Sequence, residues 1–451
     1  MLNQISIYIF LSFFVILGYF FYESGGKKLS LDFFRPYYAM SSLIFLYSLG
    51  HLLHINRYQI DHYGNPIPSI TEINIFIAVT IVGILGLQFG TALAKKRGEL
   101  EIKNDPGNSL LAKSMMFIFL LWSIFNIKKY FFKFNIFEAT TYAKTATSLR
   151  LQNAQNLNSG LIETIYVQIP TITILTRSII ILLNKKIKIF YRLLFLIPII
   201  FYFLTSWKSG WRIEFLFLFV FFLIYYHYKI KPIRIKWIIL FFFLAFFAAS
   251  VSSYLRAGNE SLSSQFSSRG FDLFSIENIS ELNTSANLGL LIHKINTKES
   301  SYKYGAILLS QIKAFAPRFL VEKRSQTGAE IFSETFFPVQ FSKGAGFGFY
   351  ILQEGYWDFG ILGVLIYMCL TGYFLERIYI IFNKIKKVSS LTVALYGIFY
   401  FYCAVASIRG GMVINFKGFL LTSSPILISI LLPLLLQCYM KITRKIFNKS
   451  A

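Results

Sequence analysis

Four arginines lie at the ends of long apolar segments of this chain. They are Arg212, Arg256, Arg318 and Arg409. A guanidinium group keeps its charge at all relevant pH values, and its planar fork matches the oxygens of a phosphate group. If these arginines converge at one mouth of a helical bundle, they predict a site for a lipid-linked diphosphate. The alternative is structural, because an arginine at a membrane surface also extends to headgroups or pairs with a carboxylate.

Two carboxylates, Glu354 and Asp358, lie inside one of the apolar segments. A charge in such a place is costly, so the pair indicates either a function or a buried ion pair. Their spacing of four places both on one face of a continuous helix. Gly355 and Gly360 beside them make a local break in that helix plausible. We interpret Glu354 as a candidate general base or acceptor-orienting group.

Other catalytic signatures are absent from the sequence. It contains no phosphate-binding glycine loop with a lysine, no HExxH and no GxSxG. The three cysteines lie in apolar segments, and His51, His54 and His62 lack the spacing of a metal site. We therefore expect no metal and no cofactor. His293 is a weaker candidate, for a proton shuttle.

These residues must be positioned by membrane helices. The chain has 451 residues, of which 55% are hydrophobic and 15% charged. Its apolar runs are long enough to cross a bilayer, where only helices satisfy the backbone in a chain of this kind. We predict an all-α, polytopic bundle of about eleven spans. They lie at roughly 4–22, 36–54, 71–94, 109–127, 161–183, 190–206, 213–228, 236–253, 346–382, 391–408 and 419–440.

The orientation follows from the loops between these spans. Cations gather in alternate loops, near residues 27–35, 95–103, 185–192, 229–236, 384–387 and 441–449. Such loops face the cytoplasm, so we expect the N-terminus outside and the C-terminus inside. The four arginines then fall on the outer side, against the general rule. The same distribution explains the net charge of +24 without nucleic acid.

Two outer segments are long. Residues 128–160 include a stretch, 139–158, that favours an amphipathic helix on the membrane surface. Residues 254–345 are too long for a simple connector and contain helical patterns near 284–295 and 305–316. The predicted organisation is therefore eight spans in 1–253, a large and mostly helical outer loop in 254–345, and three spans in 346–451.

Several short motifs together resemble the Wzy-type O-antigen and oligosaccharide repeat-unit polymerases. They are Gly210-Trp211-Arg212, Pro317-Arg318, Lys323, the stretch from Glu354 to Gly363, and Ile408-Arg409-Gly410. The topology of the whole chain resembles that family, while the matching residues lie mainly in 207–212 and 315–411. Asp358 stands where asparagine is common in such relatives.

The resemblance implies glycosyl transfer at the outer face of a bacterial inner membrane. A growing glycan on undecaprenyl diphosphate would pass to the non-reducing end of a new lipid-linked repeat unit, with a chain-length regulator as a possible partner. It implies catalytic roles for Glu354, Arg212, Arg318 and Arg409. Substrate binding would involve Arg256, Lys208, Lys323 and Asp358.

Three alternatives stay open at this point. O-antigen ligases share a similar layout and use the same lipid-linked donor. A transporter or flippase for lipid-linked oligosaccharide would need a polar path through the bilayer centre, and few charges lie in the middle of the spans. An accessory membrane protein is the third alternative.

Overall fold

A computed structural model describes most of the chain. The described residues are 2–24, 32–58, 68–96, 105, 107, 109–131, 168–209, 212–234, 236–238, 240, 282–316, 325–342, 347–385 and 388–450. Within these ranges the regular secondary structure is helical. Phe349 and Gly410 form an isolated parallel β-bridge. The predicted all-α class is therefore confirmed for the described part of the chain.

The chain divides into two compact units. The first comprises Met1–Glu99, Ile239–Ile380 and Tyr402–Lys417. The second comprises Leu100–Ile238, Ile381–Phe401 and Gly418–Ala451. Each unit is therefore built from segments that are distant in the sequence.

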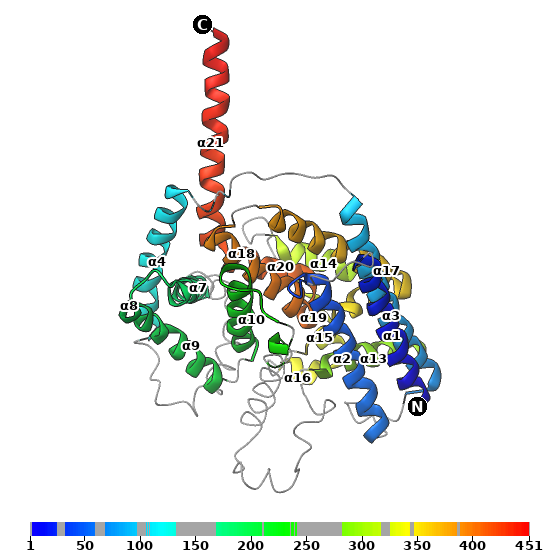
Figure 1. Ribbon diagram of the computed structural model, residues 1–451. Helices are drawn as coiled ribbons and strands as arrows, with labels where there is room; N and C mark the ends of the chain where they lie inside the picture. The colour runs from blue at the N-terminus through cyan, green and yellow to red at the C-terminus, as the bar shows by residue number, and fades with distance from the viewer. Residues whose placement is uncertain are drawn as a thin grey trace. The chain divides into compact units, whose positions relative to one another are not determined.

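The first unit begins with three long apolar helices, drawn in blue in Figure 1. They are α1 (Leu2–Ser24), α2 (Pro36–Tyr58) and α3 (Ile70–Lys96), and each packs against the other two. Helix α3 also lies against α17 (Ile351–Asn383) at glycines. A side chain on Gly90 would overlap the carbonyl oxygen of Cys369, and one on Gly372 would overlap that of Leu87. Small residues thus let two membrane helices approach at backbone distance.

Short helices precede α17 in the first unit. They are η5 (Leu282–Ser285), α13 (Ala286–Asn296), α14 (Ala306–Phe315), α15 (Gly328–Phe336) and α16 (Pro338–Ser342). Helices α13 and α14 match the patterns expected near 284–295 and 305–316, so the helical character of these parts of the long loop is confirmed. The capping box of Thr327 and Glu330 fixes the start of α15.

Helix α17 contains the break that its glycines suggested. Phe359 and Gly360 have non-helical backbone angles, and Gly360 has a φ of 62°. A Cβ atom on Gly355 would lie 2.7 Å from the carbonyl carbon of Gly363. In a straight helix, residues eight apart are separated by about 12 Å. The short segment 351–358 therefore bends sharply back against the longer segment that follows.

The last helices follow a similar broken course. Helix α18 (Ser390–Tyr400) continues through a π-helical stretch, Phe401–Ala406, into α19 (Ser407–Gly410). Helices α20 (Met412–Thr422) and α21 (Ser424–Ser450) meet at a bend of 70°. The predicted span 419–440 was wrong in being continuous, because Pro425 has no amide hydrogen to donate to the Leu421 carbonyl oxygen and its ring would clash with that carbonyl in a continuous helix.

The second unit contains α4 (Leu110–Phe131), α7 (Ile169–Leu183), α8 (Ile189–Leu194), α9 (Leu196–Ser209) and α10 (Arg212–Lys229), with α18 and α21. Helix α4 packs against α7 and α21, and α10 packs against α18. The buried carboxylate of Asp105 accepts hydrogen bonds from Ser389, Thr392 and Gly107. This contact caps the start of α18.

The number of spans is only partly supported. In the described ranges, four helices are long and apolar enough to cross a membrane: Pro36–Arg57, Ile70–Lys95, Ile351–Asn383 and Ser390–Gly410. A fifth span arises if the bent pair of α20 and α21 is counted as one. The predicted span 190–206 corresponds to two helices separated at Phe195. Span 236–253 and the surface helix 139–158 fall wholly or mainly outside the described residues, so eleven spans stay a prediction.

Candidate active site

Glu354 lies on the short segment of α17, with 2% of its surface exposed. The side-chain amide of Gln311, on α14, donates a hydrogen bond of 2.6 Å to Glu354 Oε1. The other carboxylate oxygen, Oε2, is buried and has no hydrogen-bond partner among the described residues. Burying a carboxylate oxygen without a donor is costly, so this atom needs an explanation, such as a bound water, a ligand or a catalytic role.

Gly411 fits closely against this carboxylate. Its φ is 78° and its ψ is 155°, a backbone region essentially restricted to glycine that costs other residues about 1–3 kcal/mol. A Cβ atom at this position would overlap Glu354 Oε1. Both the backbone conformation and the space available therefore require glycine here. Gly411, two residues after Arg409, thus lies against the candidate base.

Arg409 lies close to the same carboxylate in the fold. It belongs to α19, its side chain is exposed, and its carbonyl oxygen accepts a hydrogen bond of 2.8 Å from the Phe349 amide. Arg409 Cγ lies 3.1 Å from the position of a Cβ atom built on Gly348. The structure therefore brings the Arg409 motif and the Glu354 motif together, although they are far apart in the sequence.

Asp358 is bound by backbone groups. Its two oxygens accept hydrogen bonds from the amides of Ile307, at 3.0 Å, and Leu308, at 2.9 Å, in the first turn of α14. Asp358 has 3% of its surface exposed. These contacts give it a structural explanation, as the cap of a helix whose own N-cap residue is Gly305. Its expected role in substrate binding stays a prediction.

The remaining predicted cations are not located at this site by the structure. Arg256, Arg318 and Lys323 lie outside the described residues. Lys208 lies in α9 and Arg212 is the first residue of α10, both in the second unit, and the side chains of these two residues are not described. The predicted convergence of four arginines therefore stays a prediction.

Sequence reasoning missed Gln311 and Gly411. Gln311 is a polar residue on the buried side of α14, between Ile307 and Ala314, which was the available signal. Further buried polar atoms without hydrogen-bond partners among the described residues belong to the same two helices: both amide atoms of Gln353 and Trp357 Nε1 on α17, and Gln311 Oε1 on α14. Each of these atoms needs an explanation beyond the described contacts.

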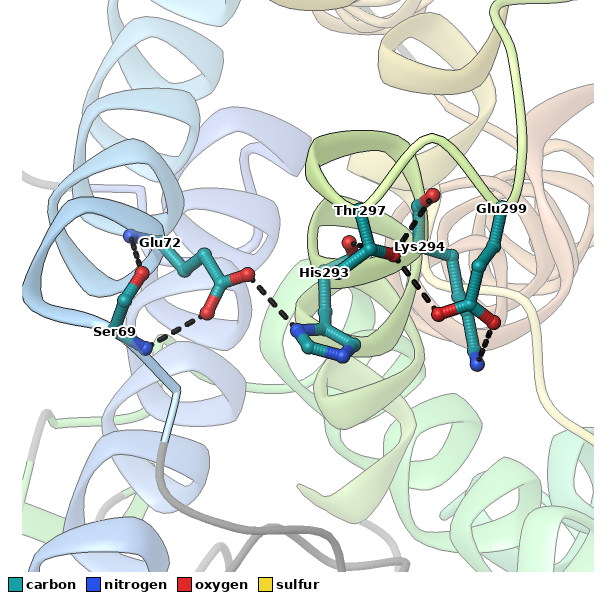
Figure 2. A network of polar contacts seen from close by, with 6 residues as sticks. All are labelled: Ser69, Glu72, His293, Lys294, Thr297 and Glu299. Atoms are coloured by element: carbon teal, nitrogen blue, oxygen red, sulfur yellow. Dashed lines mark hydrogen bonds and ion pairs between the residues drawn. The ribbon is translucent and has the colours of Figure 1, made fainter.

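His293 belongs to a different polar network, shown in Figure 2. Its Nδ1 atom lies 2.9 Å from Glu72 Oε1, and the other Glu72 oxygen accepts the Ser69 amide at the start of α3. On the neighbouring turn, hydrogen bonds from Lys294 and Thr297 hold the pKa of Glu299 below its usual value. The His293–Glu72 contact connects α13 to α3 and gives His293 a structural partner. Its role as a proton shuttle stays untested.

No group of three or more His, Cys, Asp or Glu residues suited to a metal occurs in the part of the chain that the structure describes. The described site contains Glu354, a neutral amide and glycine backbone. A carboxylate is able to accept a proton from a hydroxyl group, and Arg409 supplies a cation nearby in the fold.

The comparison with protein families agrees with these motifs. The model of the family O-antigen polysaccharide polymerase Wzy matches residues 2–442. The chain belongs to this family. The match covers nearly the whole chain and includes both units, so the predicted resemblance is confirmed. Neither the curated proteins nor the solved structures provide a significant match. Membership makes the chain a membrane protein that acts in O-antigen polymerisation, with a lipid-linked oligosaccharide as the substrate that the family implies.

Proposed function

We propose that this protein joins oligosaccharide repeat units that are linked to undecaprenyl diphosphate. A hydroxyl at the non-reducing end of a new lipid-linked unit attacks the anomeric carbon of the growing glycan. A glycosidic bond forms, the anomeric carbon–phosphate oxygen bond breaks, and undecaprenyl diphosphate leaves with the electron pair. Family membership supports the polymerase class, and the donor lipid and direction of growth are part of the proposal.

Glu354 carries this proposal. Gln311 and Gly411 fix its Oε1 side, while Oε2 has no partner in the described structure. In the proposed reaction Oε2 accepts the proton of the attacking hydroxyl. A positioned base of this kind contributes about 10²- to 10⁴-fold to a rate. Arg409, on the adjoining α19, supports a neighbouring site for negative charge.

The leaving diphosphate is stabilised by fixed cations in this proposal. Arg409, Arg212, Arg256 and Arg318 form the clamp, with Lys208, Lys323 and Asp358 in substrate binding. Guanidinium groups preorganised around a leaving diphosphate stabilise the developing charge without a metal ion. The reaction takes place at the outer face of the inner membrane, with the N-terminus outside and the C-terminus in the cytoplasm. A chain-length regulator is the expected protein partner.

The test is elongation of a purified lipid-linked repeat unit by the purified protein with a chelator present. The proposal predicts a ladder of longer lipid-linked glycans. Transfer to lipid A core without a ladder would replace it with a ligase. Movement of the substrate across vesicles, without a change in its length, would replace it with a transporter.

A further inference from the structure

Helix α14 is attached to the short segment of α17 along its first two turns. The amides of Lys303 and Tyr304 donate to the carbonyl oxygens of Trp357 and Asp358, at 2.8 and 3.0 Å. The Asp358 carboxylate then receives the first amides of α14, and one turn further Gln311 reaches Glu354. The two contacts are one helical turn apart on both helices. Glu354 and Asp358 are four residues apart on α17, and their partners Gln311 and Ile307 are four residues apart on α14.

The first contact replaces a missing cap. The N-cap residue of α14 is Gly305, with a φ of 91°, and it has no side chain that could accept the amides of the first turn. Asp358 supplies a carboxylate from another helix instead. A negative charge at the N-terminus of a helix is also favoured by the helix dipole. Asp358 therefore fixes where α14 begins relative to α17.

The second contact fixes the orientation of Glu354. Gln311 is 1% exposed and its amide hydrogen bond to Glu354 Oε1 is short, at 2.6 Å. Gly411 closes the same side of the carboxylate. Rotation of the carboxylate would break the Gln311 bond and leave a second buried oxygen without a donor. Oε2 is consequently held in a defined position, without a hydrogen-bond partner among the described residues.

We infer that Gln311 and Asp358 are positioning residues for Glu354, with Asp358 acting through α14 and Gln311 through its direct hydrogen bond. This inference rests on the proposed function of Glu354. It gives Asp358 a different role from the substrate binding expected from the sequence. It also explains why a polar residue, Gln311, lies on the buried face of α14.

The test measures elongation kinetics of purified Gln311→Met, which keeps the length of the side chain and removes its donor. Losing a hydrogen bond to a charged group corresponds to a decrease in kcat of about 10- to 100-fold. KM for the lipid-linked acceptor should stay unchanged, because the residue does not touch the substrate. The control is Lys313→Ala, an exposed position on the same helix, which should keep the wild-type kcat.

A double-mutant cycle with Glu354→Gln separates positioning from general support of the fold. If Gln311 acts through Glu354, adding Gln311→Met to Glu354→Gln should lower the residual rate by less than about 2-fold. A further loss of about 10-fold in the double mutant would overturn the inference, as would an unchanged kcat or a raised KM in Gln311→Met. If Glu354→Gln itself elongates at the wild-type rate, the proposed function of Glu354 has failed first.

Asp358→Asn is the second variant, for the case in which Gln311→Met does not fold. An asparagine keeps one oxygen acceptor for the two amides, so α14 stays attached more weakly. We expect a decrease in kcat of about 3- to 10-fold with KM unchanged, reflecting part of a hydrogen bond's contribution. A raised KM with wild-type kcat would return Asp358 to substrate binding and contradict the inference.

Discussion

Of the three buried carboxylates on helix α17, Glu354 and Glu376 have completely different surroundings. Glu376, on the long segment, accepts two hydrogen bonds from Arg35, at 2.7 and 2.6 Å, and both side chains are nearly inaccessible. Glu354, on the short segment, accepts a hydrogen bond from the neutral amide of Gln311 at Oε1, and its Oε2 atom has no hydrogen-bond partner in the part of the chain that the structure describes. A bidentate guanidinium–carboxylate pair satisfies its charges locally, whereas the other carboxylate stays available for a further group.

The contrast separates structure from function among residues of one type. A buried charge is costly without a partner, so a satisfied pair such as Arg35 and Glu376 is explained by the fold alone. Glu354 is not explained in that way, because the fold leaves part of its hydrogen-bonding capacity unused. Substitutions in each of the two regions test this difference between Glu354 and Glu376.

The largest expected effect is on folding, from Arg35→Ala. This change leaves Glu376 charged and buried without its partner, which costs about 3–5 kcal/mol. We expect a much lower yield of monodisperse protein and a clearly lower unfolding temperature in detergent. Wild-type stability of this variant would show that the pair is not a structural connection.

The next effect is on activity, from Gly411→Ala. The added methyl group overlaps Glu354 Oε1 and requires a positive φ, so the carboxylate must move. We expect elongation to fall by about 100-fold, at the lower range of losing a general base. The matched control is Gly18→Ala on α1, where a Cβ atom meets nothing within 4 Å and the rate should not change.

A smaller effect is expected from the exposed cation. Arg409→Ala should lower elongation by about 10- to 100-fold, since hydrogen bonds to charged groups contribute about 1.5–3 kcal/mol. Arg409→Lys should recover only part of this loss, because lysine cannot bind a phosphate with two parallel bonds. Complete recovery with lysine would argue against bidentate recognition, while a wild-type rate for the alanine variant would remove Arg409 from the site.

The smallest effect is expected at the surface, from Glu299→Gln. Its lowered pKa means that its stabilising contribution is present above the usual value of 4.5 and disappears as the pH falls through the folded-state value. Because the group is exposed, the unfolding temperature and elongation rate at neutral pH should match the wild type. A large loss of either the unfolding temperature or the elongation rate would show that the contacts of Glu299 at the end of α13 are required for stability or activity.

Local features of the fold were accessible from the sequence. The periodicity of 286–296 and 306–315 predicted α13 and α14, and Gly360 predicted the break in α17. The partners of these elements were not accessible. Asp358 and Ile307 are about fifty residues apart, and no local pattern states that one caps the other. Tertiary packing decides such contacts.

The site was predicted in part for the same reason. Charges at or within apolar segments are costly, which singles out Glu354 and Arg409, and the structure places their motifs together. Gln311 is neutral, so it gives no comparable signal. Pro425 is a local signal of the bend between α20 and α21, but the apolar length of a segment does not reveal it.

The most direct test compares Glu354→Gln and Glu376→Gln in one experiment. Unfolding temperature in detergent and elongation of a lipid-linked repeat unit are measured for both purified variants. We predict that Glu354→Gln keeps the wild-type unfolding temperature and loses at least about 100-fold in rate. Glu376→Gln should instead lose stability, because Arg35 keeps its charge in a buried place. A folded Glu354→Gln protein that elongates at the wild-type rate would contradict the central claim.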